Sequence, residues 1–261
     1  MKKATVLALF LVSVLACNSN DDDASTPAIE SDVTIKFTQS FDDQPVTASE
    51  FSNLDYTNEN GEQLSISRLR YLMSDIVLTD VNGIDTVISE YQFVDVGESS
   101  GALLEAPIKF EEGDYTLSMR FGFSDADNID AAYPDLNAAT WGVPAPLGGG
   151  YHYMQMEGVY INSEDVNTNY QFHTIRAAEN PGDDVILTDT SIAVNLGTVS
   201  VEGLATTIEV NMNIEEWYKN PNLWDLNDLY TMLMPDHEAQ IMMNQNGQNV
   251  FTLGDITYIS E

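Results

Sequence analysis

The chain contains few of the residues on which nucleic-acid binding and thiol chemistry depend. Its 261 residues include nine lysines and arginines, 42 aspartates and glutamates and a single cysteine, and the net charge is −33. Because nucleic-acid binding requires basic side chains that neutralise phosphates, this charge argues against a nucleic-acid partner. It argues equally against electrostatic adhesion to anionic lipids. A single cysteine also leaves no pair of thiols for a disulfide or a thiolate metal site.

Signatures of several enzyme classes are also missing. The sequence has no His-Glu-x-x-His helix, no Walker loop and no dinucleotide-binding fingerprint. No spacing among the many carboxylates points to a glycosidase pair. The hydrophobic fraction of 43% is ordinary for a globular protein, so the acidic residues decorate a folded domain. The sequence therefore predicts a folded protein that is not an enzyme.

The first residues have the pattern of a bacterial lipoprotein signal. Lys2 and Lys3 precede an apolar run, Ala4–Leu15, which is too short to span a bilayer because a spanning helix needs about 20 residues. The run Val14-Leu15-Ala16-Cys17 resembles a lipobox, and Cys17 is the only cysteine. We therefore expect residues 1–16 to be a removed signal peptide and Cys17 to be lipidated, which would attach the protein to the membrane.

The next segment, residues 17–31, is expected to be an acidic tether. Asn18-Ser19-Asn20-Asp21-Asp22-Asp23 resembles the acidic export signal of surface-exposed lipoproteins, and a plain solvated tether is the alternative. The expected location is the outer membrane, with the protein either exposed at the cell surface or facing the periplasm.

Residues 32–261 are expected to form a single all-β domain. From Val33 onward, apolar and polar residues alternate with period two, most clearly over Tyr115–Phe123. Eight to ten such runs, separated by Gly, Asn and Asp, predict an antiparallel β-sandwich, immunoglobulin-like or similar, with one or two short helices. The helices are expected at Ile214–Lys219 and at His237–Asn246. Residues 124–150 are the least regular part and are expected to be a long loop.

Two sets of residues could hold a metal ion. Asp125, Asp127 and Asp130 offer closely spaced oxygen ligands for calcium, although the loop lacks the glycine of an EF-hand, and an acidic turn is the alternative. The second set consists of the three histidines and nearby methionines, since imidazole and thioether ligands suit copper(I). Its candidates are His152, His173, His237, Met154 and Met156. The alternative is that the methionines fill gaps in the core.

Strand geometry predicts how these candidates would be arranged. If Tyr151–Ile161 and Tyr170–Ile175 form a hairpin, His173 falls opposite Met156 or Glu157. His152 would then lie about 13–17 Å further along, at about 3.3 Å per residue. This arrangement favours a site built from His173, Met154 or Met156, and His237, whereas His152 would not share the ion.

The segment Gly149-Gly150-Tyr151-His152-Tyr153-Met154-Gln155-Met156-Glu157-Gly158 resembles the Gly-Tyr-…-Glu-Gly segment of MbnP-like proteins. Arg70–Leu78, Tyr115–Phe123 and Phe172-His173-Thr174 are also similar, in the same order along the chain. The resemblance implies an all-β envelope protein that binds copper through histidine, with His173 at the matching position. It also implies that Trp141 stands where one branch carries a tryptophan oxidised to kynurenine by a di-haem peroxidase-like partner. An outer-membrane transporter is a second implied partner.

Two other functions remain compatible with the sequence. One is a surface lipoprotein that binds glycans or peptides, with Trp141, Trp217, Trp224 and Tyr151 as candidate exposed aromatic residues. The other is an interaction domain stabilised by calcium at residues 125–130. All three functions share the same expected fold and anchor, so the fold alone does not distinguish them.

Overall fold

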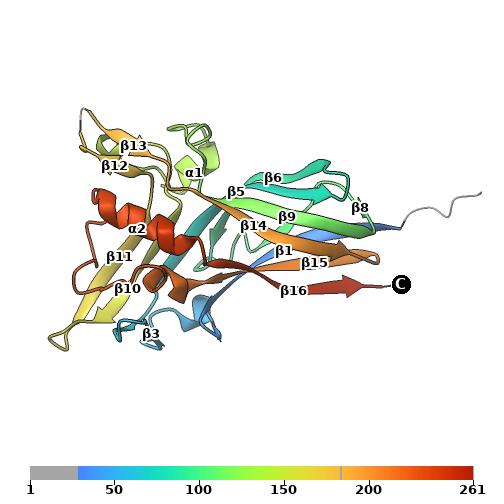
Figure 1. Ribbon diagram of the computed structural model, residues 1–261. Helices are drawn as coiled ribbons and strands as arrows, with labels where there is room; N and C mark the ends of the chain where they lie inside the picture. Colours follow the sequence, from blue (N-terminus) through green and yellow to red (C-terminus); the bar gives the residue numbers. More distant parts are fainter. Residues whose placement is uncertain (1–28, 183, 261) are drawn as a thin grey trace, which may run out of the picture.

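The computed structural model describes residues 29–182 and 184–260, and strands are its main regular elements (Figure 1). The predicted signal peptide, Cys17 and most of the tether lie outside the described residues. One sheet has six strands: β1 (Glu30–Phe41), β2 (Gln44–Pro45), β7 (Leu103–Glu105), β8 (Phe110–Glu111), β15 (Ala205–Asn213) and β16 (Phe251–Ile259).

The second sheet has eight strands: β3 (Tyr56–Thr57), β4 (Gln63–Leu64), β5 (Arg68–Asp80), β6 (Asp85–Asp95), β9 (Gly113–Phe121), β10 (Met154–Ile161), β11 (Asn167–Thr174) and β14 (Ile192–Val201). A small hairpin joins β12 (Ala177–Glu179) to β13 (Ile186–Thr188). The two large sheets curl around a shared core, which confirms the predicted all-β, sandwich-like fold.

One strand pair departs from the expected antiparallel arrangement. Strands β1 and β15 run parallel, with Asp32 opposite Ala205 and Ser40 opposite Asn213. Parallel neighbours need a long connection between them, and here residues 42–204 lie between the two strands. Strand β5 is also irregular, because its register against β9 shifts between Ser74 and Val77.

The helices lie close to their expected places. A short 3₁₀ helix, η3, covers Ile214–Tyr218, and α2 covers His237–Gly247. The side chain of Asp236 accepts a hydrogen bond from the backbone N–H of Ala239 at 3.0 Å, which caps the start of α2. The expected loop 124–150 also contains regular structure, namely α1 (Pro134–Ala138) and the 3₁₀ helix η2 (Ala145–Leu147). Elsewhere in the chain, a further 3₁₀ helix, η1, covers Ala48–Glu50.

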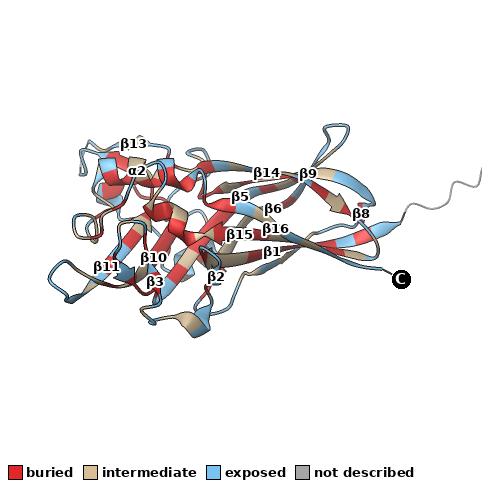
Figure 2. Cartoon of the chain, turned by 60° about the horizontal axis from the view of Figure 1, so that its bottom comes forward, coloured by how far each residue is buried: buried red, intermediate tan, exposed pale blue. Residues whose placement is uncertain are grey.

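The main core lies between the two sheets. Val33, Ile35 and Phe37 of β1 are buried and alternate with more exposed residues, as period two requires (Figure 2). A smaller cluster under the segment 124–150 contains Trp141 and Tyr151. Within the described residues, no helix is both long and apolar enough to cross a membrane.

Candidate functional site

The β10–β11 hairpin sets which candidate ligands share a face of the sheet. His173 lies opposite Gln155, and Met156 lies opposite Phe172. The expected pairing of His173 with Met156 or Glu157 is therefore wrong by one or two residues, and because side chains alternate along a strand, Met156 points to the other face. Met154 and Met156 are fully buried in the main core. They fill the core, and they do not face His173.

His173 faces the side of the sheet that is turned away from the main core. Gln155 is paired with Arg70 of β5 as well as with His173, so these three residues form a row across neighbouring strands. His173 Nε2 lies 2.9 Å from Glu157 Oε1, and the same carboxylate oxygen accepts a hydrogen bond from Arg68 at 3.1 Å. Burial lowers the pKa of His173, while Glu157 opposes this effect.

His152 lies beside His173, which corrects the expected separation of 13–17 Å. The two ring centroids are 5.5 Å apart and the rings meet edge to face. The expectation assumed a regular strand through residue 152, but β10 begins only at Met154. Before that point the backbone N–H of His152 bonds to the carbonyl of Trp141 at 3.1 Å. This turn of the chain brings the His152 ring back toward β11.

The contacts of His152 define its protonation. Nδ1 lies 2.9 Å from the Trp141 carbonyl oxygen, and Nε2 lies 3.3 Å from Met234 Sδ. A carbonyl oxygen can only accept a hydrogen bond, so Nδ1 carries the proton and Nε2 presents its lone pair to the sulfur. Burial lowers the pKa of His152 to about 4, and the ring is therefore neutral at physiological pH.

The second histidine has the corresponding arrangement. In neutral His173, Nε2–H donates to the Glu157 carboxylate, which leaves the lone pair on Nδ1. Histidines that bind metals usually donate their other N–H to a carbonyl or a carboxylate, which fixes the tautomer. Both histidines meet this condition. The pair and the Met234 thioether together offer two imidazole nitrogens and one sulfur.

Aromatic and basic side chains enclose this centre. The Trp141 ring is fully buried, and its centroid lies 5.5 Å from the His152 ring centroid. Its indole Nε1 is buried without a hydrogen-bond partner. The Arg70 guanidinium lies 5.2 Å from the Trp141 ring centroid and donates a hydrogen bond to the Ala139 carbonyl. Trp141, Arg70 and the two histidines thus form one contiguous group.

The third histidine does not join this group. His237, at the start of α2, lies 3.5 Å from Glu179 and 3.4 Å from Glu238. Within residues 29–182 and 184–260, no three His, Cys, Asp or Glu side chains are grouped closely enough to hold a metal ion. The third donor beside the histidine pair is instead the sulfur of Met234. Met234 is not among the candidates predicted from the sequence, in which its one signal is its position three residues before His237.

The carboxylates of Asp125, Asp127 and Asp130 do not converge on a common point where calcium could bind. Asp125 pairs with Arg176 at 3.5 Å, and Asp130 accepts a hydrogen bond from the backbone N–H of Gly150 at 3.2 Å. Asp127 accepts one from Ser124 at 2.5 Å. These carboxylates therefore point to different partners, and the loop fits the alternative of an acidic turn.

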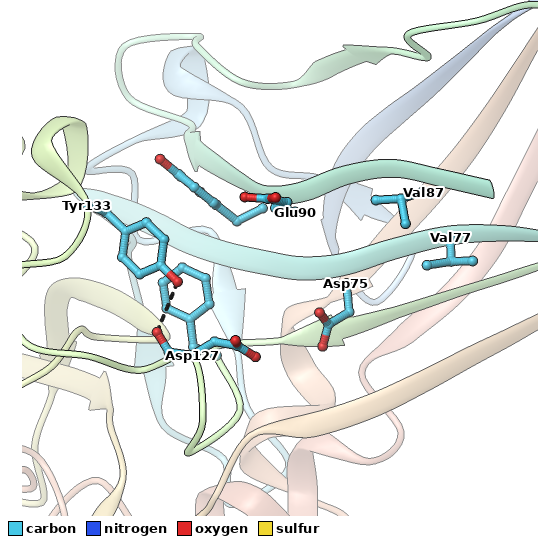
Figure 3. Close-up of a pocket in the computed structure, with 8 residues that line it drawn as sticks. Asp75, Val77, Val87, Glu90, Asp127 and Tyr133 are labelled. Carbon is cyan, nitrogen blue, oxygen red and sulfur yellow. Dashed lines mark hydrogen bonds between the residues drawn. The ribbon is translucent and has the colours of Figure 1, made fainter. Parts of the chain in front are cut away.

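The aromatic residues suggested for surface stacking are all buried. Trp141, Trp217, Trp224 and Tyr151 each have 0% of their surface exposed, because they pack in the two cores. A cavity of about 340 Å³ does open at the surface elsewhere, beside Tyr91 and Tyr133 (Figure 3). Its lining contains no histidine or methionine; the lining residues are Asp75, Val77, Val87, Glu90, Tyr91, Phe123, Asp127 and Tyr133.

One run matches the Gly-x-Ser-x-Gly pattern of serine hydrolases, at Gly97–Gly101. Ser99 has a positive φ of 52°, as a nucleophile elbow would require. However, the elbow leads from a strand into a helix, whereas this turn follows β6, is closed by a bridge between Asp95 and Ser100, and leads to β7. The run is therefore a tight turn between strands.

Comparisons with known proteins give one family and one solved structure. The family model named MbnP matches residues 30–243. The structure of MbnP from Methylosinus trichosporium has a TM-score of 0.53 and 13% sequence identity to this chain, covering 86% of this chain and 98% of that one. At this identity the structural match shows the shared fold. A comparison with curated protein sequences finds no match.

Proposed function

Because this chain belongs to the MbnP family, we propose that it binds copper(I) through His152 Nε2, His173 Nδ1 and Met234 Sδ, without catalysing a reaction. The observation that carries this proposal is the contact of 3.3 Å between His152 Nε2 and Met234 Sδ. Both atoms present lone pairs, since the proton of His152 is on Nδ1. A cation placed beside them would accept both lone pairs.

The donor types favour copper(I) over other ions. Thioether sulfur is a soft ligand and, together with imidazole, suits copper(I), whereas calcium and magnesium need oxygen ligands. Metal ligands must be deprotonated, and burial already keeps both rings neutral because it lowers their pKa values. The positive charges of Arg68 and Arg70, which also lower the pKa of His173, repel a divalent ion twice as strongly as a univalent one.

The proposal includes the envelope setting and the partners inferred from the sequence. Lipidated Cys17 would hold the domain at the outer membrane, and a di-haem partner or an outer-membrane transporter would exchange electrons or copper with it. Trp141 is the residue on which such an oxidising partner would act, since its ring adjoins His152. A mass increase confined to a peptide containing Trp141, in protein purified from its native host, would support this part; an unmodified peptide would contradict it.

Copper stoichiometry tests the central proposal. Residues 18–261 contain every described element and would be loaded anaerobically with copper(I), desalted and analysed for copper. We expect one copper ion per chain in the wild type, and loss of it in His152→Asn and in His173→Asn. His237→Asn is the matched control, because His237 lies apart from the pair, and it should retain the ion. Equal copper content in all four proteins would refute the proposed ligands.

A further inference from the structure

The segment between η3 and α2 carries a second methionine close to the proposed centre. Met232 has 73% of its surface exposed, and it is the only methionine exposed to this degree among residues 29–182 and 184–260. Its neighbour Leu233 is buried in the main core, and Met234 is half-buried against His152. We propose that Met232 receives copper(I) from a donor at the surface and passes it to Met234 and the histidine pair. This inference rests on the proposed function.

The histidine centre needs such a route because its ligands are poorly accessible. His152 has only 4% of its surface exposed, and the side chain of His173 has 12%. A donor protein or chelator of ordinary size therefore cannot bring its copper directly to either ring. Met234 is itself partly buried, and Met232, two residues earlier in the same segment, is the sulfur exposed to solvent.

The two methionines are close enough for a copper ion to pass between them. Two residues span at most about 7 Å of chain, and methionine side chains are long and flexible. Copper(I) exchanges ligands readily among soft donors, so one thioether can replace another without release of the ion into water. The transfer moves an intact Cu⁺ ion with no change of oxidation state. A bond from Cu⁺ to the donor breaks as a Cu–S bond to Met232 forms, and that bond breaks in turn as bonds to Met234 and the two histidines form.

The segment is held in place against the strand that carries His173. The buried side chain of Gln240 donates hydrogen bonds from Nε2 to the carbonyl oxygens of His173 at 2.9 Å and Leu233 at 3.0 Å. Its Oε1 accepts a hydrogen bond from the backbone N–H of Ile175 at 2.9 Å. Gln240 thus fixes Leu233, and with it Met232 and Met234, relative to His173.

The backbone at Met232 is unusual for this residue type. Its φ is 58°, a left-handed conformation that favours glycine or asparagine over a long side chain. A left-handed backbone favours glycine or asparagine, and an exposed position favours a polar side chain. Neither the backbone conformation nor the exposure of this position therefore explains a methionine here. The segment 220–236 also has no lysine or arginine but contains Asp225, Asp228 and Asp236, and this negative charge attracts a cation to the segment.

A residue on the route that is not a ligand in the final site has a defined kinetic effect. Because the dissociation constant is the ratio of the release and uptake rates, removing the Met232 sulfur must slow both by the same factor. Affinity then stays unchanged. By contrast, removing a ligand such as Met234 weakens affinity, chiefly through faster release.

The experiment compares wild type with Met232→Leu, which keeps the size and apolar character of the side chain and removes only the sulfur. Leu223→Ala is the matched control, since Leu223 is 54% exposed in the same segment and has no sulfur. Anaerobic stopped-flow mixing with a coloured copper(I)–chelator complex gives the uptake rate, reverse mixing with excess chelator gives the release rate, and equilibrium competition gives the affinity.

We expect Met232→Leu to slow uptake and release by about tenfold each, within the range of rate changes seen among variants of one binding site, with wild-type affinity and with Leu223→Ala unchanged. Wild-type rates in Met232→Leu would overturn the route while leaving copper binding intact. Weaker affinity in Met232→Leu would overturn it as well, because Met232 would then be a ligand. Absence of copper uptake by the wild type would overturn the proposed function and the route together.

Discussion

The buried His152 should make the folded protein sensitive to mild acid. Burial lowers its pKa from 6.5 to about 4 in the folded state, whereas in the unfolded chain the ring regains its ordinary value. Between these values the unfolded state binds a proton that the folded state does not. The free energy of unfolding therefore falls as the pH decreases from 6.5 toward 4.

The magnitude follows from the difference in pKa. One unit corresponds to about 1.4 kcal/mol, so the full effect is about 3 kcal/mol, of which about 2.5 kcal/mol is already lost at pH 4.5. His173 acts in the same direction, because its pKa is also lowered by burial. Metal-free protein is required, since bound copper would stabilise the neutral rings.

The assay is urea unfolding of metal-free protein at several pH values from 7.5 to 4.5. His152→Asn is the comparison, because asparagine does not titrate and its amide N–H can still donate to the Trp141 carbonyl. The carboxylates titrate in both proteins, so their contributions cancel when the unfolding free energies of the two proteins are subtracted at each pH. We expect the wild type to lose about 2.5 kcal/mol more than the variant over this range. Parallel curves for the two proteins would refute the assignment of a neutral, buried His152.

Three further predictions concern other positions. Gln240→Ala should lower the free energy of unfolding by about 3 kcal/mol, because it leaves buried backbone groups unpaired. Gln240→Glu replaces the donating Nε2 with a second acceptor oxygen that faces the carbonyl oxygens of His173 and Leu233, so it should lose at least as much in the same urea assay at pH 7.5; a smaller loss would contradict donation by the Gln240 side chain. Trp141→Phe should cost about 2 kcal/mol through lost volume. The variant should still retain copper by elemental analysis, because the hydrogen bond that orients His152 goes to the backbone carbonyl of residue 141 and not to its side chain; loss of copper would show that the indole itself is needed. Gly158→Ala should cost about 3 kcal/mol, because a Cβ there would overlap the Ser65 carbonyl. The control Gly83→Ala has open space around its Cβ and should cost about 1 kcal/mol. Thermal unfolding of both variants measures this difference.

Period-two alternation predicted most strands because it reflects burial of one face, which is a local property. The run Tyr115–Phe123 became β9 with little change of bounds, and α2 begins at His237 as predicted. The parallel pairing of β1 with β15 was not predicted, since it depends on a contact between strands about 170 residues apart, and the sequence carries no local sign of it. Helix α1 was missed because its five residues are too few for a periodic pattern.

The candidate site was predicted in its residue types but not in its arrangement. Imidazole and thioether do meet, yet the sulfur belongs to Met234 and not to Met154 or Met156. The predicted pairing of His173 with Met156 differs from the observed one by one residue. Such a shift moves Met156 to the opposite face of the sheet from His173. The position of His152 was predicted wrongly because the spacing of a regular strand was applied to residue 152. That residue lies before the start of β10 at Met154, where strand spacing no longer applies.

The two histidines are oriented by different acceptors, and this difference gives them different roles in the proposed centre. His152 donates to a neutral carbonyl, whereas His173 donates to the Glu157 carboxylate, which makes its other nitrogen the more electron-rich ligand. Glu157 is shared with Arg68, so this effect is moderated and His173 remains neutral. His173, fixed within β11, is thus the stronger and more rigid ligand, while His152 and Met234 come from two loops. A copper ion bound by all three would tie both loops to the sheet, and since the unfolded chain offers no such site, binding would stabilise the fold.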